Sequence, residues 1–129
     1  MQLRGRDRGA AAVEFALVLP LLVLLVFGIA EFGRAYHIQT TLSGAARDGV
    51  RVMALQNSQS AARTSAKSAA PSLHLTDAQI AVGPATCVVA GLTPASTATV
   101  TITYPLKFVT KLFGASVTLT GKGSMRCNG

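Results

Sequence analysis

Hydrophobic and polar positions form three successive patterns along the chain, and the first is a long apolar run. From Ala10 to Ala30 only Glu14 and Pro20 interrupt it. About 20 apolar residues are enough to cross a bilayer as a helix. The sequence therefore predicts a transmembrane helix over residues 10–33.

The second pattern is a stripe of apolar positions spaced alternately three and four residues apart, which is typical of a helix with one apolar face. Its members are Ala35, Ile38, Leu42, Ala45, Gly49 and Val52. No proline occurs between Pro20 and Pro71, so we expect one helix from about Ala11 to Gln56. Residues 34–56 would continue this helix outside the membrane, with the stripe facing a partner.

Polar residues from Asn57 to Ser60 predict a break after the long helix. A short second helix is expected over Ala61–Ala70, ending at Pro71. Residues 57–77 would then form a linker that contains this helix.

The third pattern is the alternation typical of strands. It is clearest over Thr97–Tyr104, where one face would carry Ala98, Val100, Ile102 and Tyr104, and Pro105 is expected to end the strand. A last strand is predicted over Ser116–Thr120, extending to Arg126, with Val117 and Leu119 pointing inward.

Weaker signals complete this part of the chain. Ala78–Val82 and Cys87–Ala90 are short β-like runs, and Lys107–Phe113 is expected to form one helical turn. Residues 78–129 would thus form a small antiparallel sheet that leans on the long helix. The predicted fold class is α+β.

Composition and charge narrow the class of protein. Half of the residues are hydrophobic and only 13% are charged, which disfavours an ordinary cytosolic enzyme. The net charge of +7 suits an anionic membrane surface or another acidic partner. Basic residues without interleaved aromatics give no reason to expect nucleic acid binding.

The orientation of the membrane helix follows from the basic residues before it. Arg4, Arg6 and Arg8 stand against a single Asp7 in this stretch. The positive-inside rule then places the N-terminus in the cytoplasm and the part after Arg34 outside. We expect a single-pass membrane protein with a periplasmic C-terminal domain.

Candidate chemistry is sparse. The chain has two Cys and two His, and it contains neither a phosphate-binding glycine loop nor a Gly-x-Ser-x-Gly motif. We therefore predict that it is not an enzyme and has no metal or cofactor. Cys87 and Cys127 are expected to form a disulfide in an oxidising compartment, and two unpaired thiols are the alternative.

The N-terminal segment allows two interpretations of processing. A basic start followed by an apolar stretch also fits a secretory signal cleaved after Ala30. Cleavage there would release a small secreted or anchored module, with an acidic surface polymer as its ligand. Glu14 at the edge of the apolar stretch, and the helical pattern that continues beyond Ala30, argue against this alternative.

A family resemblance favours the other interpretation. Gly9-Ala10-Ala11-Ala12-Val13-Glu14, after a basic leader and before an apolar segment, resembles the class III signal of type IV pilins. The longer stretch from Arg8 to about Ala54, with AARDGVR near its end, resembles the TadE/TadG-like minor pilins, or pseudopilins, of the tight-adherence (Tad or Flp) pilus.

The resemblance implies that residues 1–9 are a leader, removed between Gly9 and Ala10 by prepilin peptidase in the inner membrane. It also implies a role in assembly of a pilus used for adhesion. The partners would be other pilins, Tad pilus-assembly proteins and inner membrane lipid. The protein would either prime assembly or enter the extracellular filament.

The same resemblance gives Glu14 a role. In type IV pilins the corresponding Glu is proposed to pair with the N-terminal amine of a neighbouring subunit, here that of Ala10. An ionised carboxylate beside hydrocarbon is costly and favours such a partner, whereas a position at headgroup level would need none. Pro20 removes a hydrogen bond to the Ala16 carbonyl and is expected to kink the helix.

Overall fold

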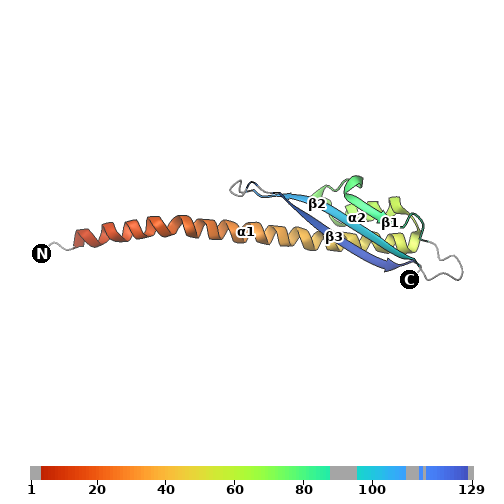
Figure 1. Ribbon diagram of the computed structural model, residues 1–129, viewed down its shortest axis with the longest axis horizontal. Helices are drawn as coiled ribbons and strands as arrows, with labels where there is room; N and C mark the ends of the chain where they lie inside the picture. The colour runs from red at the N-terminus through yellow and green to blue at the C-terminus, as the bar shows by residue number, and fades with distance from the viewer. Residues whose placement is uncertain (1–3, 88–95, 110–113, 115, 128–129) are drawn as a thin grey trace. The chain divides into compact units, whose positions relative to one another are not determined.

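The computed structural model describes residues 4–87, 96–109, 114 and 116–127 (Figure 1). Its elements are helices α1 (Arg4–Gln56) and α2 (Gln59–Ala69), 3₁₀ helices η1 (Pro71–Leu73) and η2 (Asp77–Gln79), and strands β1 (Ile80–Gly83), β2 (Thr97–Lys107) and β3 (Ser116–Arg126). The chain divides into two compact units, Met1–Arg34 and Ala35–Gly129. The predicted α+β class is confirmed.

Helix α1 ends at Gln56 as predicted, although it begins at Arg4 rather than near Ala11. Asn57 ends it with a φ of 49°, a left-handed conformation that Asn tolerates better than most residues, and its N–H donates to the Met53 carbonyl at 3.0 Å. The Ser58 side chain then caps α2 by accepting from the Ala61 N–H at 3.3 Å. The predicted break therefore takes two residues only, and α2 starts earlier than Ala61.

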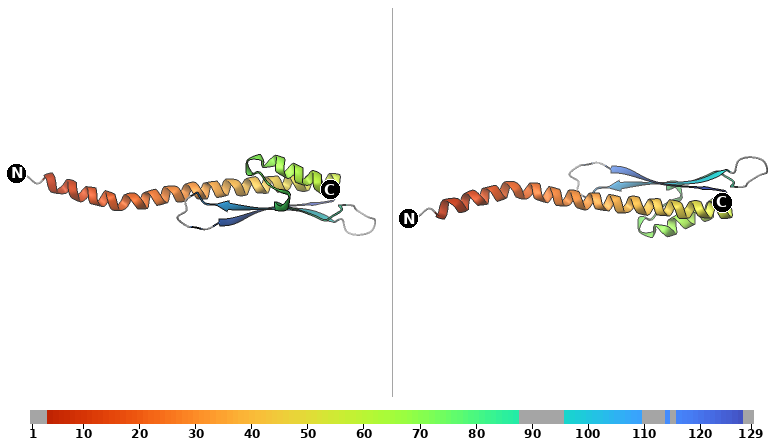
Figure 2. Two further views of the ribbon diagram at one scale, coloured as in Figure 1. Left: turned by 90° about the horizontal axis from the view of Figure 1, so that it is seen from above. Right: turned by 90° about the horizontal axis from the view of Figure 1, so that it is seen from below.

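The three strands form one antiparallel sheet in the order β1-β2-β3. Figure 2 shows the sheet as one layer, with the yellow end of α1 and the green α2 along one of its faces. Ala98, Val100 and Ile102 are fully buried and Tyr104 is partly buried. This confirms the inward face that alternation predicted for Thr97–Tyr104.

Strand β2 does not end at Pro105, as the sequence suggested, but continues to Lys107. The Cys127 N–H donates to the Ser96 carbonyl at 2.9 Å, and backbone hydrogen bonding alternates from residue to residue along an antiparallel pair. The N–H and C=O groups of even-numbered β2 residues therefore bond to β3, and those of odd-numbered residues point away from it. Pro105 therefore turns its nitrogen toward the side of β1, whose pairing stops at Ile102. Its missing N–H removes no ladder hydrogen bond there.

The predicted helical turn over Lys107–Phe113 is wrong at its start, because Lys107 is the last residue of β2. Residues 110–113 lie outside the described part of the chain. The strand predicted over Ala78–Val82 begins only at Ile80, since Asp77–Gln79 forms the 3₁₀ helix η2. Cys87 belongs to no strand, and residues 88–90 of the run predicted there also lie outside the described part.

Strand β3 packs through its backbone rather than through large side chains. A Cβ on Gly121 would lie 2.5 Å from the Leu42 carbonyl group, and one on Gly123 would lie 2.7 Å from the Ala46 oxygen. Leu119 is partly buried, but Val117, which was predicted to point inward, is 42% exposed. Val117 lies near one end of an edge strand, and the close approach to α1 is made further along, at the glycines.

One apolar core joins the helices and the sheet within Ala35–Gly129. Gly49 belongs to its tight centre, because a Cβ there would lie 3.1 Å from the Ala62 carbonyl oxygen and 3.5 Å from the Val100 side chain. The largest fully buried side chains of the core are Leu42, Met53, Ile80, Ile102, Leu106, Val100, Cys87 and Cys127. Helix α1 thus packs on both α2 and β2 in this unit.

Candidate functional site

The predicted processing motif lies in helix α1, with Gly9, Ala10 and Glu14 all exposed. A Cβ on Gly9 would meet no described atom within 4 Å. Ala10 and Glu14 are four residues apart and so lie on the same helix face. The bond between Gly9 and Ala10 is about one and a half turns from the start of α1, and fraying near a helix end costs little free energy. The motif is therefore sterically open among the described residues.

Glu14 is an acidic residue within the apolar run from Ala10 to Ala30. Its side chain makes no hydrogen bond or ion pair with the described residues. Val13 and Phe15 beside it are exposed apolar side chains. A carboxylate in such surroundings is costly beside hydrocarbon, and a cationic partner would lower that cost. Within the described chain the geometry offers Glu14 no such partner.

The segment after Glu14 exposes an apolar surface all around the helix. Its exposed large side chains are Phe15, Leu17, Val18, Leu19, Leu21, Leu22, Val23, Leu24, Leu25, Val26, Phe27 and Ile29. Soluble proteins rarely expose contiguous apolar patches of this extent. By length and composition, α1 can cross a membrane, and among the described residues it is the helix that meets this test. The chain is thus compatible with single-pass membrane anchoring.

Pro20 does not interrupt α1, which is helical on both sides of it. In Figure 2 the red and orange part of α1 is curved but unbroken. Proline removes one helical hydrogen bond, and membrane helices tolerate this loss where it is satisfied in another way. A kink at Pro20 stays a prediction.

The apolar segment is followed by a charged pair. The Glu31 carboxylate lies 3.6 Å from the Arg34 guanidinium, and Phe32 between them is 75% exposed. Charged side chains that directly follow an apolar run suit the level of lipid headgroups. The sequence indicated Arg34 only as a boundary, and the i,i+3 spacing of Glu31 and Arg34 was the available signal for their pairing.

The apolar stripe beyond Arg34 does not face a partner, which corrects the prediction. Ile38, Leu42 and Ala45 are buried in the core of this same chain. Gly49 is also buried, whereas Ala35 and Val52, at the ends of the stripe, are partly buried. The periodicity indicated a contact face, but it could not show that the chain's own α2 and sheet cover it.

The predicted disulfide between Cys87 and Cys127 is present, with the two Cα atoms 5.3 Å apart. Each of the two cysteines is contacted by a polar side chain. The Cys87 N–H donates to the Asn57 side chain, and the Ser96 hydroxyl lies 3.3 Å from the Cys127 sulfur. The disulfide therefore ties the end of β3 to the segment after β1 and, through Asn57, to the turn between α1 and α2.

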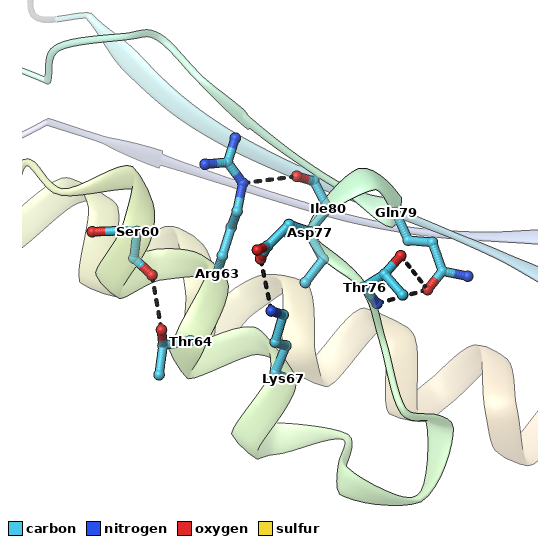
Figure 3. A network of polar contacts seen from close by, with 8 residues as sticks. All are labelled: Ser60, Arg63, Thr64, Lys67, Thr76, Asp77, Gln79 and Ile80. Carbon is cyan, nitrogen blue, oxygen red and sulfur yellow. Dashed lines mark hydrogen bonds and ion pairs between the residues drawn. The ribbon is translucent and has the colours of Figure 1, made fainter.

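A polar network fastens α2 to the segment that leads into β1 (Figure 3). Arg63 Nε donates to the Ile80 carbonyl at 3.2 Å, and Lys67 Nζ lies 2.7 Å from the Asp77 carboxylate. The hydrogen bond from Lys67 and its positive charge lower the pKa of Asp77. Thr76 and Gln79 close η2 with a reciprocal capping box.

The groups of this network bind one another, so its geometry indicates a structural role. No group of three or more His, Cys, Asp or Glu that could hold a metal ion occurs within the described ranges. The features that remain for function are the processing motif and the exposed apolar segment of α1.

These features define a class: a small α+β protein with an N-terminal helix suited to membrane anchoring and a disulfide-closed C-terminal unit. Residues 9–51 match the family model of TadE-like proteins. The match begins at Gly9 and covers about a third of the chain, so the sheet lies outside it. No curated protein and no solved structure matches the chain.

Proposed function

We propose that this chain is a minor pilin-like subunit needed for assembly of a Tad/Flp type IV pilus. The supporting observation is the coincidence of three features in one segment: the TadE-like match from Gly9, the Gly9–Glu14 motif and an exposed apolar helix. In this proposal the chain contributes binding surfaces to an assembly and no catalysis.

Processing comes first in the proposed sequence of events. Arg4, Arg6 and Arg8 hold the leader in the cytoplasm, and α1 spans the inner membrane. Prepilin peptidase then cleaves between Gly9 and Ala10, which creates a charged amine on Ala10. The unit from Ala35 onward lies in the periplasm, a compartment that permits the Cys87–Cys127 disulfide.

Glu14 then acts as a contact between subunits. Its carboxylate has no partner among the described residues, and the new Ala10 amine of a neighbouring pilin would supply one. Ion pairing in a region of low dielectric is strong, and it holds the neighbour at a defined axial position. Other pilins and Tad assembly proteins are the proposed partners.

The experiment replaces Glu14 with Gln in a strain that lacks the chromosomal gene. Gln keeps the size of the side chain but not its charge, and charge-assisted hydrogen bonds are roughly twice as strong as neutral ones. We expect Glu14→Gln protein to be cleaved and inserted normally but to support few or no pili. Pilus counts by electron microscopy, surface attachment and a blot for the cleaved form measure this.

The matched control is Glu31→Gln, which makes the same chemical change outside the motif. We expect this variant to form pili like the wild type. Normal pili with Glu14→Gln would remove Glu14 from the mechanism. Wild-type pilus counts in the deletion strain itself would refute the proposed function as a whole.

A further inference from the structure

Among the residues that the structure describes, the outer edge of β3 is open except at the Thr120 carbonyl. The sheet order places β3 at an edge, and the bond from the Cys127 N–H to the Ser96 carbonyl sets the alternation along it. Odd-numbered residues of β3 bond to β2, so even-numbered residues turn their N–H and C=O groups outward. Gln39 supports this assignment independently, because its Nε2 donates to the outward Thr120 carbonyl at 2.8 Å.

The other edge of the sheet is covered more completely than that of β3, where one outward carbonyl has a side-chain donor. Strand β1 is only four residues long, and side chains of α2 occupy its outward carbonyls. Arg63 Nε donates to Ile80 O at 3.2 Å, as Figure 3 shows, and Gln59 Nε2 donates to Val82 O at 3.1 Å. Strand β3 has eleven residues. Long unprotected edges are templates for pairing with another strand.

The charged side chains of β3 itself are all basic. Lys122 and Arg126 are exposed on β3, and Arg47 is exposed on α1, where its backbone lies beside Gly123. None of the three strands contains Asp or Glu, and over residues 35–129 Lys and Arg outnumber Asp and Glu by eight to two. A second copy of β3 would bring like charges together, whereas acidic side chains complement them.

We propose that the outer edge of β3 binds an extended, acidic strand of another protein by β-augmentation. The partner strand hydrogen-bonds the outward backbone groups of Thr118, Lys122 and Ser124. Its carboxylates lie beside Lys122 and Arg126. This surface goes beyond the proposed pilus function and needs no cleavage at Gly9, so its test is independent of processing.

The binding test uses the full chain in detergent micelles and a fluorescent peptide of alternating Glu and Val. A peptide with Lys in place of Glu is the matched probe. Because each cross-strand charge pair contributes a modest free energy, we expect the acidic peptide to bind at least about tenfold more tightly. Lys122→Glu should lower the affinity for the acidic peptide and raise that for the basic one, as fluorescence anisotropy would measure.

A second variant separates the contribution of backbone hydrogen bonds to peptide binding from the contribution of charge. Ser124→Pro removes an outward N–H without removing a bond to β2, and Pro105 already occupies an equivalent outward position on β2. We expect Ser124→Pro to abolish peptide binding and Ser124→Thr to retain it. Hydrogen exchange should be fast at the Thr118, Lys122 and Ser124 amides of the free chain and slow when the acidic peptide is bound.

Three results would overturn the proposal. The first is equal affinity for the two peptides, with no response to Lys122→Glu. The second is slow exchange of these β3 amides in the free chain, which would mean that the chain covers its own edge. The third is protection that rises with protein concentration in the absence of peptide, which would identify a second copy as the occupant.

Discussion

At the scale of single residues, Gly121 and Gly123 determine how closely β3 approaches α1. Both face the helix backbone, at Leu42 and Ala46, with no room for a methyl group. A glycine at such a position is required by the close approach rather than by a turn. Neither glycine was recognised from the sequence, where alternation assigned the inward role to Val117 and Leu119.

The first prediction follows from this contact. Gly121→Ala and Gly123→Ala each require a backbone shift, and we expect a loss of about 1–3 kcal/mol in the free energy of unfolding. Gly44→Ala is the control, because a Cβ on this exposed helical glycine meets no atom within 4 Å. That variant should be as stable as the wild type or more stable by up to about 1 kcal/mol. Thermal unfolding followed by circular dichroism measures the difference, and an unchanged melting temperature for Gly121→Ala would contradict the packing described.

Asp77 gives a pH-dependent prediction. Its pKa is lowered from 3.8 by the hydrogen bond and charge of Lys67, so the ionised form stabilises the fold. This contribution is complete above the ordinary carboxyl pKa and is lost as the pH falls through the lowered value in the folded state. Asp77→Asn should therefore lower the melting temperature slightly at pH 7, and this difference should shrink as the pH falls below 3.8. A difference that is as large at pH 2 as at pH 7 would exclude the ion pair as its cause.

At the scale of elements, local patterns predicted whether a segment is a helix or a strand more reliably than the residue at which it ends. The alternation over Thr97–Tyr104 predicts β2 and its buried face, but Pro105, which predicts the end of the strand, lies within it. Proline ends a strand only where a neighbouring strand would accept a hydrogen bond from its missing N–H. Whether this is so at Pro105 depends on the register of β2 with β1 and β3. No local pattern contains this information.

The apolar stripe of α1 shows the same limit. Its spacing predicted a helix with one contact face over residues 35–52, and that face is buried from Ile38 to Gly49 and partly buried at its ends. Its partner turned out to be the chain's own α2 and sheet. Periodicity identifies the face that must be covered, whereas what covers it depends on tertiary contacts far apart in the sequence.

The Cys87–Cys127 disulfide closes a loop of 40 residues, and its contribution can be measured. In the chain-entropy model a loop of this length stabilises the fold by about 4 kcal/mol. We expect both cysteines to be oxidised in protein isolated from the cell envelope, and reduction to lower the melting temperature. Labelling of both thiols before any reductant is added would contradict this prediction.

At the scale of the whole molecule, the candidate site could be predicted almost entirely from the sequence. Gly9, Ala10 and Glu14 form a local motif, and the apolar segment after them is apparent from composition. The family match over residues 9–51 supports the resemblance to TadE-like proteins. No cationic group of the described chain pairs with Glu14, so its contact with the amine of a neighbouring subunit stays a prediction.

The central claim is that the chain becomes a pilin-like subunit by cleavage between Gly9 and Ala10. N-terminal sequencing of the protein from cells that contain prepilin peptidase tests it most directly. We predict a mature start at Ala10, and we predict that Gly9→Leu blocks cleavage because a bulky side chain does not fit beside the scissile bond. A mature start at Glu31, or a Gly9→Leu protein that is shortened like the wild type, would contradict the claim.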